Sequence, residues 1–150
     1  MRIIIQRVQN ASVTIEGECH SQIGKGMMIL LGIEEPDTDE DIEWLVKKIT
    51  NLRIFDDTDG VMNLSIKDVH GEILVVSQFT LFASTKKGNR PSYIRAAKPE
   101  ISVPLYEKFC TTLSQAMEVP VKTGVFGADM KVALINGGPV TICIDSKHKE

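Results

Sequence analysis

Residues 131–145 read KVALINGGPVTICID, two apolar runs on either side of an Asn-Gly-Gly-Pro segment at 136–139. A tight hairpin would account for the glycines, because Asn-Gly is a common two-residue turn between antiparallel strands. Asn-Gly alone would be enough for such a turn, however, and here a second glycine, a proline and the polar Thr141 follow. The stretch therefore predicts strand on both sides of 136–139 and leaves the purpose of Gly138–Pro139 open.

Strand signals continue through the rest of the chain. The segments RIIIQRVQ, SVTIEG and GMMILLGIE, at 2–9, 12–17 and 26–34, are rich in β-branched or apolar residues and are separated by Asn or Gly. Residues 53–66 read as two short extended pieces around an Asp/Gly turn, and residues 71–82, GEILVVSQFTLF, read as a strong strand. These patterns predict a sheet built from many strands.

Two helices are expected, because two segments carry apolar residues at helical spacing. The two apolar faces consist of Ile42, Leu45, Val46, Ile49 and Leu52, and, within 102–117, of Leu105, Tyr106, Phe109, Leu113 and Met117. Asp37 or Thr38 is a suitable N-cap for the first helix, and Pro104 is compatible with the first turn of the second. Many strands with only two helices, segregated along the chain, predict an α+β fold with a largely antiparallel sheet.

Composition limits the class of protein. The 150 residues contain no repeat or linker, so a single domain spanning 1–150 is expected. The net charge of −3 gives no global basic signature for nucleic acid, and no apolar run reaches the roughly 18 residues of a membrane span. Cys19, Cys110 and Cys143 form no CxxC pair, which predicts buried small side chains and a reducing cytoplasm rather than disulfides or a zinc site.

Polar side chains interrupt the strongest strand where its apolar run stops. Ile73–Val76 predicts a strand buried on both faces, and Ser77, Gln78 and Thr80 follow it. Buried polar groups need partners, so the strand is expected to emerge at these residues. Two interpretations are open: a strand end that reaches solvent, or a row of hydroxyl, amide and N–H groups that lines a pocket and binds an oxyanion.

Residues 84–98, STKKGNRPSYIRAAK, form a polar loop without an acidic residue, although the chain is acidic overall. The basic residues around Tyr93 in this loop are Lys86, Lys87, Arg90, Arg95 and Lys98. A basic patch beside an aromatic ring binds phosphates and stacks a base, but a solvated surface loop explains the same composition.

Standard catalytic and metal motifs are missing from the sequence. His20, His70 and His148 lie in turn-like or terminal segments without metal-ligand spacing, and they are expected at the surface. The DDTDG segment at 56–60 predicts a turn, because it lacks the ligand series and closing Glu of a calcium loop. No metal site is therefore predicted.

Two stretches, SQFTL at 77–81 and NGGPVT at 136–141, resemble the SQFTL and NxGPVT motifs of the D-aminoacyl-tRNA deacylase family. The similarity also includes QRV, GMMILLGI, RIF, MN, NRPS and GVFGADM, and so covers nearly the whole chain. It implies the α+β fold of that family, with a barrel-like sheet and two main helices. It further implies a cytoplasmic hydrolase without a cofactor, which cleaves aminoacyl-tRNA at the ester to the 3′-terminal adenosine.

The resemblance also assigns site residues. It implies that the catalytic residues are Ser77, Gln78, Phe79 and Thr80, and that Gly138 and Pro139, joined by a cis peptide bond, select chirality. In the family this Gly-Pro element projects into the active site of the other subunit, which implies a homodimer. The supporting residues are Arg7, Asn136, Gly137, Thr141, Phe126 and Met130, and the candidate tRNA contacts are Lys86, Lys87, Arg90 and Arg95.

Two mechanisms are compatible with these assignments. Thr80 as a nucleophile needs an activating base, and the sequence offers no evident Ser/Thr–His pair. In the favoured interpretation, the neighbouring 2′-hydroxyl of the tRNA assists hydrolysis, while the backbone at Phe79 and Thr80 stabilises the oxyanion. Two rival hypotheses treat both motifs as structural: a non-catalytic RNA-binding dimer, and an oligomeric scaffold without affinity for RNA.

Overall fold

The computed structural model describes all residues 1–150, and its sheet is organised around one long strand, β1 (Arg2–Ile15). The strands that pair antiparallel with β1 are β2 (Glu18–Ile23), β3 (Gly26–Gly32) and β8 (Lys131–Asp145). Beyond β3 follow β6 (Glu72–Ser77) and β7 (Lys122–Thr123), each parallel to its neighbour. The sheet is therefore antiparallel around β1, as predicted, and parallel along β3, β6 and β7.

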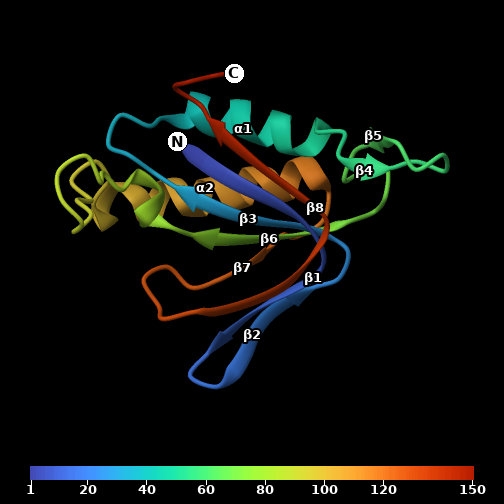
Figure 1. Ribbon diagram of the computed structural model, residues 1–150, viewed down its shortest axis with the longest axis horizontal. Coiled ribbons are helices and arrows are strands. Elements are labelled where there is room, and N and C mark those ends of the chain that lie inside the picture. Colours follow the sequence, from blue (N-terminus) through green and yellow to red (C-terminus); the bar gives the residue numbers. More distant parts are fainter.

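Two helices, α1 (Asp39–Asn51) and α2 (Pro99–Met117), pack against each other and lie along one side of the sheet (Figure 1). α1 is capped by Thr38, whose N–H donates to the Asp41 carboxylate at 2.8 Å. α2 begins earlier than expected, so Pro104 lies inside the helix rather than in its first turn. The apolar faces of both helices are buried as the spacing predicts.

Both faces of the central strands are buried. Alternate residues of a strand point to opposite faces. Ile29 and Val75 accordingly belong to the larger core with the helices, whereas Met28 and Leu74 belong to a second core on the other face. Figure 1 shows why this second core exists: β2, the end of β1 and the start of β8 curl under the sheet. The prediction that Ile73–Val76 is buried on both faces is confirmed, and so is the barrel-like shape.

A separate hairpin extends from one end of the molecule (Figure 1) and consists of β4 (Phe55–Asp56) and β5 (Met62–Leu64). Its turn is closed by Asp57 Oδ1, which accepts hydrogen bonds from the N–H groups of Asp59 and Val61. The DDTDG segment is therefore a turn, as predicted.

Residues 131–145 form one continuous strand, β8, and the hairpin that Asn-Gly would allow does not occur. β8 follows β1 along its whole length, but the register jumps in the middle. Gln6 pairs with Thr141 and Val8 with Asn136, so five steps along β8 match only two along β1. The surplus backbone, which includes Gly138–Pro139, forms a wide bulge.

Not all surface predictions hold. Cys19 and Cys143 are exposed and Cys110 is only partly buried, so the predicted burial of the three cysteines is wrong. Cys143 is turned outward because Ile142 and Ile144 on the same strand pack against the core, and strand residues alternate. The three histidines are exposed, as expected. None of the helices is long and apolar enough to cross a bilayer.

Candidate active site

A pocket of about 310 Å³ opens where β6 ends. Its walls come from β6 and η1 (Phe79–Phe82), from the loop between β7 and β8, and from the start of α2. These segments meet on the left of Figure 1. The predicted site residues among its lining are Ser77, Gln78, Phe79, Phe126 and Met130. The polar strand end therefore lines a cavity, and we name it the strand-end pocket.

Close contact between β3 and η1 holds the SQFTL segment at the pocket. The Gln78 N–H donates to the Leu31 carbonyl at 2.8 Å, which continues the sheet ladder by one residue. Gly32 lies directly beneath η1, and a Cβ added there would come within 2.9 Å of Leu81 Cβ and 3.1 Å of the Gln78 oxygen. Glycine at position 32 is thus what lets η1 approach this closely.

The polar groups of SQFTL include donors but no evident base. The Gln78 side-chain nitrogen donates to Thr80 Oγ1 at 2.5 Å, and an amide N–H cannot accept the hydroxyl proton. Phe79 and Thr80 are the first residues of η1, so their N–H groups have no acceptor within that helix. They also make no hydrogen bond in the turns and loops. Two adjacent N–H groups are therefore available to a ligand.

Other candidate nucleophiles and bases are unsuitable. Asp129 lines the pocket, but it is highly exposed and pairs with Lys131 at 3.0 Å. On α2, burial raises the pKa of the Cys110 thiol to about 11, so it is not a thiolate at neutral pH. No group of three His, Cys, Asp or Glu side chains is placed to hold a metal ion.

The Gly-Pro bulge is anchored by Arg7. Arg7 Nε donates to the Gly137 carbonyl at 2.8 Å, and its Nη1 donates to the Ile54 carbonyl at 2.7 Å and to Asp56 at 3.2 Å. Arg7 thus ties the bulge to the segment between α1 and β4, and to β4 itself. The Gly138–Pro139 peptide bond is cis, the geometry that the resemblance implies, and both residues are exposed.

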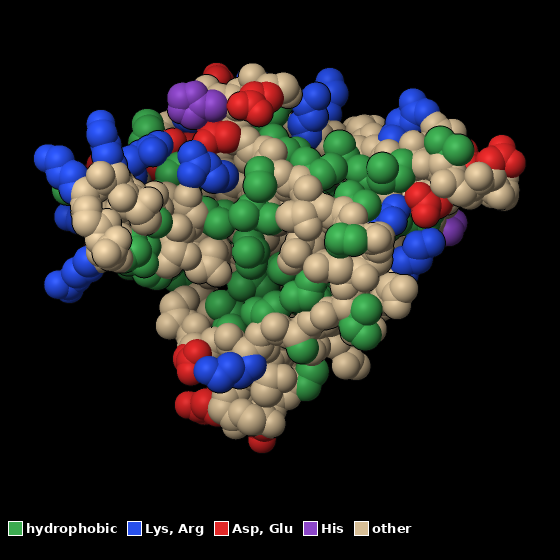
Figure 2. All heavy atoms as spheres, in the orientation of Figure 1, with side chains coloured by type: hydrophobic (Ala, Val, Ile, Leu, Met, Phe, Trp, Pro, Cys, Tyr) green, Lys and Arg blue, Asp and Glu red, His purple; other side chains and the backbone are tan.

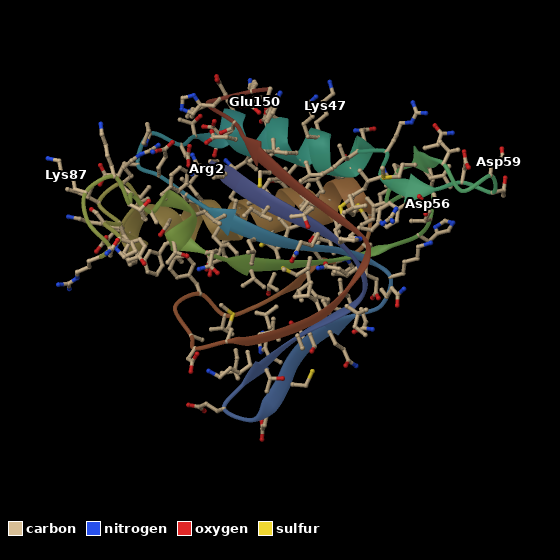
Figure 3. All side chains as sticks on the ribbon, viewed as in Figure 1. Arg2, Lys47, Asp56, Asp59, Lys87 and Glu150 are labelled. Carbon is tan, nitrogen blue, oxygen red and sulfur yellow. The ribbon has the colours of Figure 1, made fainter.

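Within one chain, the Gly-Pro bulge is remote from the strand-end pocket. Along β1, the pocket residue Leu31 lies opposite Ile3, whereas the bulge lies opposite Arg7. Four residues of strand correspond to roughly 13 Å. In Figure 3, Asp56, which pairs with Arg7, lies toward the opposite end of the molecule from Lys87 of the basic loop. The bulge contributes no residue to the lining of this pocket.

The basic loop lies at the same end as the pocket. Ser84 and Ser92 exchange backbone hydrogen bonds of 2.8 and 2.9 Å, which close the loop into a hairpin-like arch. Lys86, Lys87 and Arg90 are exposed and take part in no ion pair of the chain. Figure 2 shows cationic side chains gathered at this end, and Figure 3 shows Lys87 pointing outward.

Arg95 differs from the other three basic residues. Its guanidinium binds Glu34 at 3.0 Å and lies over the Phe82 ring at 5.4 Å, so it has protein partners already. It ties the loop to the segment after β3. Of the four candidate tRNA contacts, three therefore have free charges and one has a structural partner.

The sequence did not predict several of the residues that line the pocket. Three of them line the pocket from different segments: Ala97 lies just before α2, Ser102 near the start of α2, and Val132 on β8. Ser102 is buried and its hydroxyl donates at 3.1 Å to the Lys98 carbonyl, four residues earlier, as serines within helices can do. Only the packing of α2 and β8 around the end of β6 brings these residues to the site.

Comparison with known proteins shows which family the chain resembles. A family model described as D-Tyr-tRNA(Tyr) deacylase matches residues 4–145. A D-aminoacyl-tRNA deacylase of Bacteroides thetaiotaomicron is 72% identical over 150 residues, which is all of both chains. One of Parabacteroides distasonis is 64% identical over the same span.

Two solved structures share the fold. One, a c-Myc DNA unwinding element binding protein, is 43% identical and covers 97% of this chain and 98% of its own, with a TM-score of 0.90. The other, a probable eukaryotic D-amino acid tRNA deacylase, is 19% identical and covers 95% and 97%, with a TM-score of 0.83. At that identity the second likeness concerns the fold alone.

Proposed function

The chain belongs to the D-Tyr-tRNA(Tyr) deacylase family and is a D-aminoacyl-tRNA deacylase, and we propose that it hydrolyses its substrate by tRNA-assisted catalysis in the strand-end pocket. The bond cleaved is the ester between the D-amino acid and the ribose of the terminal adenosine. Membership of an enzyme family sets aside the two non-catalytic hypotheses.

The observation that carries the mechanism is the pair of free N–H groups at Phe79 and Thr80, together with the absence of a base at Thr80. Such N–H groups stabilise the negative charge that develops on the ester carbonyl oxygen. The 2′-hydroxyl adjoins the ester within the substrate and needs no further positioning to assist attack by water. Ser77 and Gln78 shape the pocket, and Gln78 orients the Thr80 hydroxyl.

Chiral selection requires a wall that an L-residue would strike. We assign this wall to Gly138–Pro139 of a second copy of the chain, in a homodimer with two composite sites. The exposed bulge, remote from its own pocket and fixed by Arg7, is suited to reach a neighbouring subunit. Asn136 and Thr141 flank it at the register jump and brace it. The side chain of an L-residue would clash with this wall, so the enzyme discriminates against L-aminoacyl groups by steric exclusion.

Steric rejection has a consequence for glycine. The Gly138–Pro139 carbonyls hold the substrate α-amino group, and the D-side chain points toward solvent, so no side-chain pocket is needed. Glycine has no Cβ to strike the wall. Glycyl-tRNA is accordingly a substrate as well.

The test compares D-Tyr-tRNA, L-Tyr-tRNA and Gly-tRNA, each also prepared with a terminal 2′-deoxyadenosine. D-Tyr-tRNA and Gly-tRNA should be deacylated and L-Tyr-tRNA spared, and the deoxy substrates should react far more slowly. Full activity on the 2′-deoxy substrate would contradict tRNA-assisted catalysis. Gly-tRNA that resists hydrolysis while D-Tyr-tRNA reacts would contradict steric rejection.

A further inference from the structure

One aromatic residue at the edge of the strand-end pocket has no part in the proposed chemistry. Tyr93 packs edge-to-face on Phe79, with ring centroids 5.1 Å apart and an interplanar angle of 77°. Phe79 lines the pocket, and Tyr93 does not. Tyr93 therefore lies immediately outside the cavity, and it is 39% exposed, whereas Phe79 is 55% exposed.

The backbone around Tyr93 is held in place. The Ser84–Ser92 hydrogen-bond pair fixes the residue before it, and the Tyr93 carbonyl accepts the Ala96 N–H at 3.0 Å. Arg95 adds the ion pair with Glu34. A ring that is exposed and yet ordered in this way presents a preorganised surface, which lowers the entropic cost of binding a flat ligand.

Three features lie in order from the pocket toward the tip of the basic loop. The cavity comes first, then the Phe79–Tyr93 pair, then the free cations of Lys86, Lys87 and Arg90. The single-stranded 3′ end of a tRNA has the matching order: an ester on a terminal nucleoside, the next base, and successive phosphates. Proteins bind single-stranded nucleic acid by stacking its bases on aromatic rings while cations follow the backbone.

We propose that Tyr93 is a specificity residue that stacks the base preceding the terminal adenosine, so that the enzyme recognises at least two nucleotides of its substrate. The inference rests on the proposed site for the ester in the strand-end pocket. Because every base has a π-face, Tyr93 reads the presence of a base and not its identity. The surface distinguishes the end of an RNA chain from a free aminoacyl nucleoside.

Three minimal substrates test the proposal, each carrying D-tyrosine on a terminal adenosine. The first is the adenosine alone, the second has an abasic nucleotide before it, and the third is cytidylyl-adenosine. The abasic substrate supplies the added ribose and phosphate without the base. The ratio of kcat/KM between the third and second substrates therefore reports stacking alone. If a Tyr93 variant displaces Phe79, kcat/KM changes by the same factor for both substrates, and the ratio is unaffected.

The wild-type ratio should be roughly 5- to 150-fold, the range typical for stacking one base on an aromatic side chain. Tyr93→Ala should bring the ratio close to unity, whereas Tyr93→Phe should retain it, since the ring persists. Val119→Ala removes an exposed apolar side chain that lies beyond α2 and outside the pocket, and it should also retain the ratio.

The outcomes separate this inference from the function on which it rests. A wild-type ratio near unity, or a Tyr93→Ala ratio equal to the wild type, would overturn the role of Tyr93 while leaving the pocket assignment intact. Failure of the wild-type enzyme to hydrolyse even D-Tyr-tRNA would overturn both.

Discussion

At the scale of single residues, the proposed mechanism depends on the absence of a base beside the Thr80 hydroxyl. The only side-chain hydrogen bond of Thr80 comes from an amide donor, so its hydroxyl has no group to take its proton. Thr80→Val should therefore reduce kcat far less than the roughly 10⁶-fold typical of losing a true nucleophile. Single-turnover deacylation of D-Tyr-tRNA measures the effect. An acyl-enzyme trapped on Thr80 would contradict this account.

Arg7 is the residue that holds the Gly-Pro bulge in place. Its planar fork donates to the Gly137 and Ile54 carbonyls at once, which a lysine ammonium cannot reproduce. Arg7→Lys should lower kcat/KM for D-Tyr-tRNA roughly 10- to 100-fold, the worth of a charge-assisted hydrogen bond.

Arg53→Lys is the matched control for this change. Arg53 donates to one carbonyl, that of Asn63, but it is exposed and makes no hydrogen bond to the bulge. Its kcat/KM should stay within about twofold of the wild type, as for most surface substitutions. Equal losses in both variants would indicate that Arg7 acts through general stability instead.

At the scale of elements, the position of η1 depends on the contact between β3 and the SQFTL segment. A Cβ at Gly32 would lie 2.9 Å from Leu81 Cβ, so Gly32→Ala must push η1 outward. Overpacking of this kind costs about 1–3 kcal/mol, which for 150 residues lowers Tm by roughly 3–10 °C. The kcat for D-Tyr-tRNA should fall as well, since the free N–H groups move with η1.

Gly24→Ala serves as the control for Gly32→Ala. A Cβ there meets only the end of the Glu72 side chain, at 3.4 Å, so both Tm and kcat should remain near the wild-type values. Differential scanning calorimetry and single-turnover kinetics on the same preparations measure both. A Gly32→Ala enzyme with unchanged kcat would show that η1 tolerates displacement.

The start of α1 is pinned to the C-terminal segment, and the contact depends on pH. Burial alone would raise the pKa of Asp41, but hydrogen bonds from Lys147, Ser146 and the Thr38 N–H lower this pKa to about 2. A carboxylate whose pKa is lower in the folded state stabilises the fold above its unfolded pKa, and this stabilisation is lost as pH falls toward 2.

Asp41→Asn should therefore destabilise the protein by about 1–2 kcal/mol at pH 7 and by much less near pH 2. Urea unfolding of both proteins at pH 7, 4 and 2 measures the difference in free energy of unfolding. A difference that is constant with pH would mean that the Asp41 charge contributes nothing and that the substitution acts through packing.

At the scale of the whole molecule, the separation of pocket and bulge predicts composite sites. Gly138→Ala places a Cβ within 2.8 Å of Arg7 Nη2 and at a φ of +125°, so it should inactivate the wall while leaving the pocket intact. Gln78→Ala damages the pocket and leaves the wall. Each variant alone should be nearly inactive.

Mixing the two variants should restore activity. In a C2 dimer each site pairs one subunit's pocket with the other's bulge, so random mixing should recover about a quarter of wild-type activity. Subunits tagged differently allow the mixed dimer to be isolated and assayed. If mixed dimers form but remain inactive, the bulge does not act across subunits.

The sequence by itself determined most of the local structure. The spacing of Ile42, Leu45, Val46 and Ile49 predicted α1, and the Ile73–Val76 run predicted a strand buried on both faces. These predictions hold because helix and strand periodicities are properties of neighbouring residues and need no knowledge of what packs against them. The residue types of SQFTL and NGGPVT likewise singled out both segments as candidates for function before any fold was known.

Only the tertiary structure decided how these segments relate. Asn-Gly favours a hairpin locally, yet β8 stays continuous because pairing with β1 on both sides of the bulge outweighs a turn preference. Cys19 and Cys143 face outward because strand register, not residue type, sets their direction. The pocket joins residues from β6, η1, α2 and β8, and the distance between pocket and bulge follows from register along β1. Such relations are set by contacts between residues far apart in the chain, which no local pattern encodes.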